Sequence, residues 1–130
     1  MKKSIVENQL GKVLIIDDDE DVLLAAKMVL KKYASQVLIE KNPKKIPFLL
    51  NNDTYDLILL DMNFSKDITS GKEGFYWLEQ ILEKDSQAVV ILITAFGDVE
   101  MAVKALKAGA TDFVLKHWQN EKLIASLSSA

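Results

Sequence analysis

Short, uninterrupted apolar runs alternate along this chain with longer segments in which apolar and polar residues are mixed. Runs of the first kind are typical of parallel strands that are buried on both faces of a sheet. Five such strands are predicted: Val13–Ile16, Val37–Ile39, Leu57–Leu60, Val89–Ile93 and Phe113–Leu115.

In the mixed segments apolar residues recur at spacings of three and four, which predicts amphipathic helices. The predicted core-facing stripes are Val22, Leu23, Ala26, Val29, Leu30 and Tyr33 in the first helix, Phe75, Leu78, Ile81 and Leu82 in the third, and Val99, Ala102, Val103 and Leu106 in the fourth. Asp98 can cap the fourth helix at its start and Gly109 can close it. A second helix over 43–51 is predicted although Pro47 falls inside it, and a fifth covers Asn120–Leu127.

Strand and helix thus alternate five times, which predicts a doubly wound α/β fold with a parallel sheet. The order 2-1-3-4-5 of flavodoxin-like folds fits five strands joined by right-handed crossovers, with five helices. Residues 12–128 are expected to form one domain, preceded by an arm over residues 1–11. In such sheets ligands bind outside the carboxyl ends of the central strands.

Composition narrows the class of protein. A chain of 130 residues that is 49% hydrophobic can bury one sizeable core. The formal net charge of -3, with 16 basic residues that are all lysine, argues against direct contact with nucleic acid or membrane. Without cysteine, a signal peptide or a long apolar span, the chain is expected to be a soluble cytoplasmic protein.

Polar side chains follow four of the five predicted strands. Asp17 and Asp18 end the first, Asp61 ends the third, Thr94 ends the fourth and Lys116 ends the fifth. Because the carboxyl ends of parallel strands share one edge of the sheet, these groups should lie together. Crowded carboxylates repel one another and resist ionisation unless a cation compensates them.

A divalent cation with oxygen ligands, most simply Mg²⁺, would supply that compensation at Asp17, Asp18 and Asp61. Protein-bound Mg²⁺ usually shares its coordination with a phosphoryl group, whose other oxygens Lys116 and Thr94 could contact. An aspartate can itself be the nucleophile in phosphoryl transfer. Asp61, central in the predicted sheet, is the candidate for that role.

With these residues in place, the chain resembles the receiver domain of two-component response regulators over Lys12 to Leu127. The resemblance implies that Asp17 and Asp18 are the acidic pair of the metal site and that Asp61 is the phosphoacceptor. It further implies that Thr94 is the family's hydroxyl residue and that Lys116 is its lysine.

By the same resemblance the backbone carbonyl of Asn63 would be a further metal ligand, and Phe113 would be an aromatic switch acting with Thr94. The small Ala95 would leave the phosphoryl site accessible. The stretch ITAFGDVEMAVKALKAGATDFVLK is similar to receivers of enhancer-binding activators, which work with the sigma-54 form of RNA polymerase.

The resemblance also implies partners and activity. A sensor histidine kinase or phosphotransfer protein would supply the phosphoryl group. The fourth helix, fifth strand and fifth helix would form the face that signals onward, with a homodimer as one form of that signal. The chain would catalyse only its own phosphorylation and dephosphorylation, so it is not expected to be an enzyme in the metabolic sense.

Two features depart from the family pattern. His117 stands where receivers usually have a proline after the lysine. Matching Gly74 to the family's usual glycine leaves the loop after Asp61 about five residues longer than usual. The first could redirect Lys116, and the second could alter access to the site.

Three other interpretations remain open from the residues. Asp17, Asp18 and Asp19 could simply cap the first helix, with Asp19 and Glu20 no more than first-turn charges. A haloacid-dehalogenase-type phosphatase would use Asp17 as nucleophile within an Asp-x-Asp motif, although Asp21 does not suit that motif. A degenerate receiver that is never phosphorylated would act as a docking module.

Overall fold

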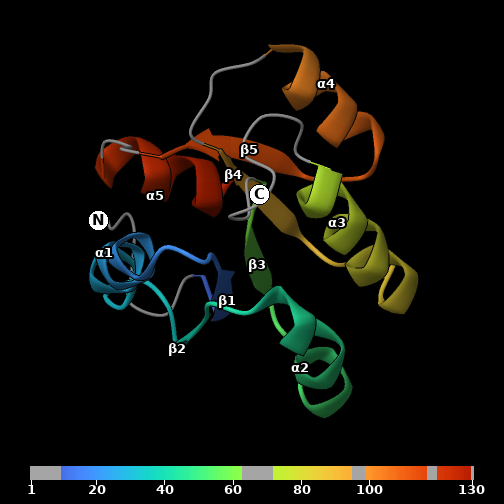
Figure 1. Cartoon of the computed structure of the whole chain (residues 1–130). Coiled ribbons are helices and arrows are strands. Elements are labelled where there is room, and N and C mark those ends of the chain that lie inside the picture. Colours follow the sequence, from blue (N-terminus) through green and yellow to red (C-terminus); the bar gives the residue numbers. More distant parts are fainter. Residues whose placement is uncertain (1–9, 63–71, 95–98, 117–119, 130) are drawn as a thin grey trace.

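In the computed structural model, five parallel strands form one sheet in the order β2-β1-β3-β4-β5, as predicted (Figure 1). The structure describes residues 10–62, 72–94, 99–116 and 120–129. The strands are β1 (Lys12–Ile16), β2 (Gln36–Glu40), β3 (Leu57–Asp61), β4 (Val90–Thr94) and β5 (Asp112–Leu115). All four strand pairs are parallel, so the carboxyl ends lie at one edge.

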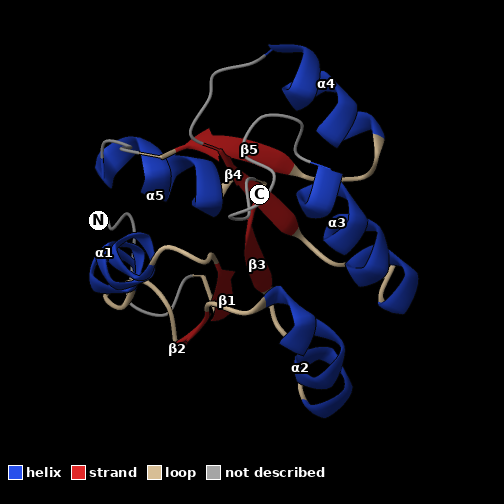
Figure 2. Cartoon of the chain, in the orientation of Figure 1, coloured by secondary structure: helices blue, strands red, loops and turns tan. Residues whose placement is uncertain are grey.

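Helices cover both faces of the sheet (Figure 2). They are α1 (Glu20–Leu30), α2 (Ile46–Asn52), α3 (Lys72–Lys84), α4 (Val99–Lys107) and α5 (Asn120–Ser128), with a short 3₁₀ helix η1 (Pro43–Lys45) before α2. Helices α1 and α5 lie on one side of the sheet, and α2, α3 and α4 lie on the other. This is the predicted doubly wound, flavodoxin-like arrangement.

Successive residues of each central strand pack on opposite faces of the sheet, because side chains alternate along a strand. Val13 and Ile15 of β1 belong to the core beneath α1 and α5, while Leu14 and Ile16 belong to the core beneath α2, α3 and α4. All four are completely buried. The uninterrupted apolar runs seen in the sequence follow from this burial on two faces.

Pro47 does not break the second helix because the helix begins at Ile46, which places the proline in the first turn. Backbone N–H groups of the first turn have no partner inside a helix, so a proline there loses no hydrogen bond. The 3₁₀ turn lies just before α2, and the Asn42 side chain caps this turn by accepting the backbone N–H of Lys44. The predicted helix over 43–51 is therefore present as η1 followed by α2.

The core-facing stripe predicted for the fourth helix is wrong at two positions. Val103 and Leu106 are each 44% exposed, whereas Ala105 is buried in the core beneath α4. Among the described side chains of α4, that of Ala105 therefore packs in this core, while Val103 and Leu106 are directed toward solvent. Gly109, with φ +111, ends this segment in the left-handed conformation that glycine tolerates, as predicted.

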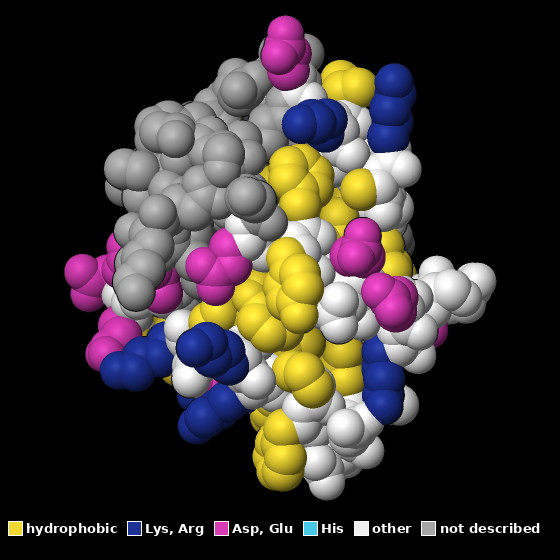
Figure 3. All heavy atoms as spheres, turned by 45° about the vertical axis from the view of Figure 1, so that its right-hand side comes forward, with side chains coloured by type: hydrophobic (Ala, Val, Ile, Leu, Met, Phe, Trp, Pro, Cys, Tyr) yellow, Lys and Arg dark blue, Asp and Glu magenta, His cyan; other side chains and the backbone are white. Residues whose placement is uncertain are grey.

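The side of the molecule formed by α2, α3 and α4 carries a band of apolar side chains, flanked by lysine and acidic residues (Figure 3). Exposed apolar residues on these helices include Phe48, Tyr76, Val103 and Leu106. None of the helices in the described segments combines the length and apolar character needed to cross a membrane.

The chain enters the domain at Leu10, which is buried and donates its backbone N–H to the carbonyl of Tyr33 at 2.7 Å. Residues 1–9 of the predicted arm lie outside the described residues. The division into an arm over residues 1–11 and a domain over 12–128 stays a prediction.

Candidate functional site

The sheet register brings the four predicted polar positions to one edge. Ile16 pairs with Leu60, and the next residues in both strands are therefore neighbours, Asp17 and Asp61. Asp61 pairs in turn with Ile93, and Thr94 pairs with Leu115, the residue before Lys116. The edge that sequence reasoning predicted is thus present, with its members in adjacent strands.

Asp17 is held by the backbone on two sides. Its N–H donates to the carbonyl of Glu40 at 3.1 Å, which extends the pairing of β1 with β2 by one residue. Its Oδ1 atom accepts the N–H of Asp19 at 2.9 Å. The side chain of Asp17 is fully buried, so its position is determined by these contacts and not by solvent.

Lys116 joins the two buried carboxylates. Its Nζ atom lies 3.3 Å from Asp17 Oδ2 and 3.3 Å from Asp61 Oδ1, and only 13% of the lysine side chain is exposed. The backbone N–H of Lys116 donates to the carbonyl of Thr94 at 2.7 Å, which carries the β4–β5 pairing up to the lysine. Lys116 is therefore directed into the site, while His117 lies outside the described residues.

Asp18 completes a group of three carboxylates. One oxygen from each of Asp17, Asp18 and Asp61 lies within 4.8 Å of the others. Asp17 Oδ2 is buried and accepts no hydrogen bond from the described residues. The three carboxylates offer oxygen ligands and carry more negative charge than the one ammonium beside them can balance. They therefore fit a hard divalent cation such as Mg²⁺.

Burial raises the pKa of the Asp17 carboxyl above its ordinary value, against the opposing effects of the Asp19 N–H and the Lys116 ammonium. Burial acts to lower the pKa of Lys116, but the charges of Asp61 and Asp17 outweigh it and raise that pKa. Lys116 is thus stabilised in its charged form, whereas burial makes the ionised form of Asp17 unfavourable.

The raised pKa of Asp17 predicts how stability depends on pH without metal. The folded state binds the Asp17 proton more tightly than the unfolded state, so the contribution of this group is fully present below its unfolded pKa and is lost as pH rises through its folded pKa. The amide of Asp17→Asn does not ionise, so this variant does not lose stability in this way as the pH rises. In chelator, its free energy of unfolding relative to the native chain should increase as the pH rises above about 4 in urea titrations. A difference that falls as the pH rises would contradict the assignment.

The other predicted positions are placed as follows. Thr94 is 5% exposed at the end of β4, and Phe113 is partly buried against the core beneath α2, α3 and α4. Asn63 and Ala95 lie outside the described residues. The metal, catalytic and switch roles assigned to these side chains stay predictions.

Asp19 is more than the first-turn charge that the sequence analysis expected. Its side chain is the N-cap of α1 and accepts the backbone N–H groups of Asp21 and Val22. Glu20 also has a specific contact, an ion pair with Lys41 at 3.0 Å. The preference of aspartate for N-cap positions was the sequence signal for the first contact, whereas nothing local in the sequence indicated the second.

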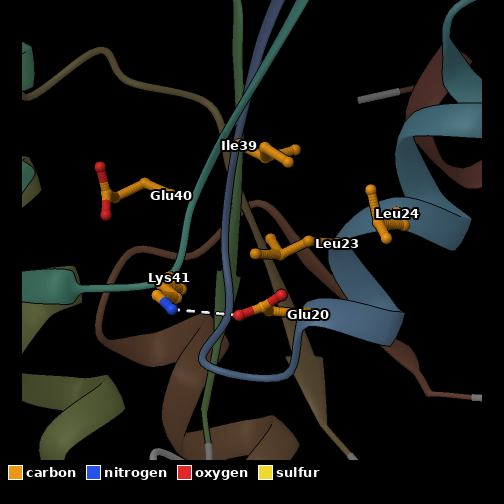
Figure 4. A pocket seen from close by; sticks show the side chains of 6 residues that line it. All are labelled: Glu20, Leu23, Leu24, Ile39, Glu40 and Lys41. Atoms are coloured by element: carbon orange, nitrogen blue, oxygen red, sulfur yellow. Dashed lines mark hydrogen bonds and ion pairs between the residues drawn. The ribbon is translucent and has the colours of Figure 1, made fainter.

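A shallow cavity of about 320 Å³ lies beside this ion pair, between α1 and the end of β2 (Figure 4). Leu23, Leu24 and Ile39 form its apolar wall. The ion pair of Glu20 with Lys41 spans its end nearest the start of α1. The cavity is open, and none of Asp17, Asp18 and Asp61 lines it.

Comparison with known proteins gives the family. The model of the response regulator receiver domain matches residues 13–128. The chain belongs to the response regulator receiver domain family. Receiver domains are phosphorylation-activated switches of two-component signalling rather than classical enzymes, and this membership overturns the phosphatase alternative centred on Asp17.

Curated relatives of this receiver domain include regulators of transcription. It is 32% identical over 105 residues to the response regulator protein PilR of Pseudomonas aeruginosa, covering 81% of this chain and 22% of that protein. It is 30% identical over 120 residues to the uncharacterized transcriptional regulatory protein YkoG of Bacillus subtilis, covering 92% of this chain and 50% of that protein. The chain thus spans half or less of the length of these relatives.

Solved structures agree with the fold. The N-terminal signal receiver domain of a two-component system response regulator from Bacteroides fragilis has a TM-score of 0.80 and 35% identity, covering 92% of this chain and 97% of that one. The BeF3-activated DrrB receiver domain has a TM-score of 0.76 and 25% identity, covering 91% and 94%.

Proposed function

We propose that this receiver domain accepts a phosphoryl group on Asp61 with the help of Mg²⁺ held by Asp17, Asp18 and Asp61. The observation that carries the proposal is the position of Asp61, buried at the end of the central strand β3, 3.3 Å from Lys116 Nζ and within the three-carboxylate group. The backbone carbonyl of Asn63 is proposed as a further metal ligand.

In the proposed transfer, a carboxylate oxygen of Asp61 forms a bond to phosphorus while the bond from phosphorus to the donor breaks. The electron pair leaves with the donor's imidazole nitrogen, if the donor is a phosphohistidine of a sensor kinase or phosphotransfer protein. Bound Mg²⁺ would neutralise charge on the phosphoryl oxygens. Lys116, already directed at Asp61, would pair with another of those oxygens, and Thr94 would donate its hydroxyl to a third.

The added dianionic group would change the contacts made by Lys116 and Thr94 and bias the domain toward a second conformation. Phe113, partly buried in β5 three residues before Lys116, is proposed to turn inward in that conformation. The exposed apolar side chains on α4 and β5 include Val103 and Leu106 of α4 and Leu115 of β5. This α4-β5-α5 face is the proposed output surface and a possible homodimer interface.

The downstream output is proposed to be transcription in the cytoplasm, by analogy with relatives whose names describe transcriptional regulatory proteins. The similarity of 93–116 to receivers of enhancer-binding activators supports an output that depends on sigma-54. The receiver itself is not proposed to contact nucleic acid or membrane, in keeping with its net charge of -3.

Incubation with acetyl phosphate, with Mg²⁺ or with chelator, followed by intact-mass measurement, tests the proposal. We expect a single phosphoryl adduct that forms only with Mg²⁺ and decays after the donor is removed. Absence of an adduct at every donor concentration, including on rapid quenching in acid, would contradict phosphorylation and favour the degenerate receiver.

A further inference from the structure

The segment that joins β1 to α1 links the metal site to the start of a helix through one residue. Asp19 donates its backbone N–H to Asp17 Oδ1 at 2.9 Å. Its own Oδ1 accepts the N–H of Asp21 at 2.9 Å and that of Val22 at 3.4 Å. The same residue therefore contacts a proposed metal ligand on one side and caps α1 on the other.

These contacts fix the backbone of Asp19. The residue is extended, with φ -93 and ψ 109, as an N-cap residue should be. Its carbonyl accepts the N–H of Leu23 at 3.1 Å, the first hydrogen bond of the helix. The side chain and the carbonyl of Asp19 are both bound to α1, which holds its Cα and amide nitrogen in the position from which the N–H donates to Asp17.

Without the N–H of Asp19, the Asp17 side chain would have greater freedom to turn about its own bonds. Its Oδ2 accepts no hydrogen bond from the described residues, and its remaining side-chain contact is with the long Lys116 side chain, whose Nζ lies 3.3 Å from Oδ2 and 3.5 Å from Oδ1. Groups that orient a ligand commonly contribute on the order of tenfold to metal affinity.

We propose that Asp19 is a positioning residue for the metal site, whose side-chain cap on α1 holds its backbone N–H against Asp17. The inference rests on the proposed function, since it takes Asp17 as a metal ligand. It adds a residue that does not touch the metal or Asp61 and that acts through the geometry of the helix start.

Asp19→Ala, Asp19→Asn and Asp19→Gly separate positioning from stability and from charge. Alanine removes the cap and should weaken Mg²⁺ binding on the order of tenfold. Asparagine retains a capping oxygen and should restore affinity close to that of the native chain, although the charge is gone. Glycine is a tolerated N-cap that costs little stability but leaves the backbone free, so it should still weaken binding.

The measurement is the Mg²⁺ dissociation constant by titration calorimetry, at a temperature where circular dichroism shows each variant to be folded. Asp21→Ala is the matched control: it removes a neighbouring first-turn charge whose side chain makes no hydrogen bond with the described residues, and it should leave affinity nearly unchanged.

The inference is overturned if Asp19→Ala and Asp19→Gly bind Mg²⁺ as the native chain does, because the cap would then serve stability alone. It is also overturned if Asp19→Asn is as weak as Asp19→Ala, which would indicate a charge effect. Failure of the proposed function looks different: the native chain would not bind Mg²⁺, or Asp17→Asn would bind it equally well.

Discussion

Asp61→Asn should reduce Mg²⁺-dependent phosphorylation by acetyl phosphate at least about a hundredfold, because an amide is not a nucleophile toward phosphorus. Asparagine has nearly the size of aspartate, so the buried end of β3 should retain its packing. The expected time course is a linear increase of phosphoryl adduct for the native chain and no measurable increase for the variant, followed by intact mass.

The matched control is Asp21→Asn, which makes the same chemical change at an exposed position in the first turn of α1. It should be phosphorylated at nearly the native rate. Undiminished phosphorylation of Asp61→Asn would show that another residue is the nucleophile, and equal loss in both variants would show that the loss reflects net charge.

The second large effect is expected at Lys116. Lys116→Met keeps most of the side-chain volume but leaves the buried carboxylates of Asp17 and Asp61 without their shared ammonium. Removal of one partner from a buried ion pair is strongly destabilising, so without metal the variant should lose at least about 2 kcal/mol of unfolding free energy. Saturating Mg²⁺ should restore a large part of this loss, because the cation would supply the missing positive charge.

Urea unfolding of the native chain and Lys116→Met, each in Mg²⁺ and in chelator, gives the four free energies required. Lys107→Met, on the exposed surface of α4, is the control and should change stability by less than about 0.5 kcal/mol. If Mg²⁺ stabilised Lys116→Met no more than the native chain, the lysine and the cation would not be compensating the same carboxylates.

The order of the strands and the edge where the polar residues meet could be predicted from the sequence because both follow from regular features. Continuous apolar runs such as Val13–Ile16 require burial on two faces, and the residue that follows each run is carried to the shared edge. The positions of Asp17, Asp61 and Lys116 thus depend on where each apolar run ends, which can be seen directly in the sequence.

Two features could not be predicted: which apolar side chains of α4 would be buried, and the hydrogen bond between Asp19 and Asp17. In helix α4, periodicity alone did not indicate that Ala105 would be buried while Val103 and Leu106 stayed exposed. The link between Asp19 and Asp17 was missed for another reason. This contact is made by the backbone N–H of Asp19. Every residue except proline has such a group, so the residue type gives no sign of the contact.

Peptide mass spectrometry can show which carboxylate carries the phosphoryl group. The native chain is phosphorylated with acetyl phosphate and Mg²⁺, the acyl phosphate is reduced with borohydride to a stable homoserine, and the modified residue is identified by peptide mass spectrometry. If Asp61 is the phosphoacceptor, it should be the one residue that is modified. Modification at Asp17 or Asp18 instead would contradict this role, since those carboxylates would then be reacting groups and not the support of the metal.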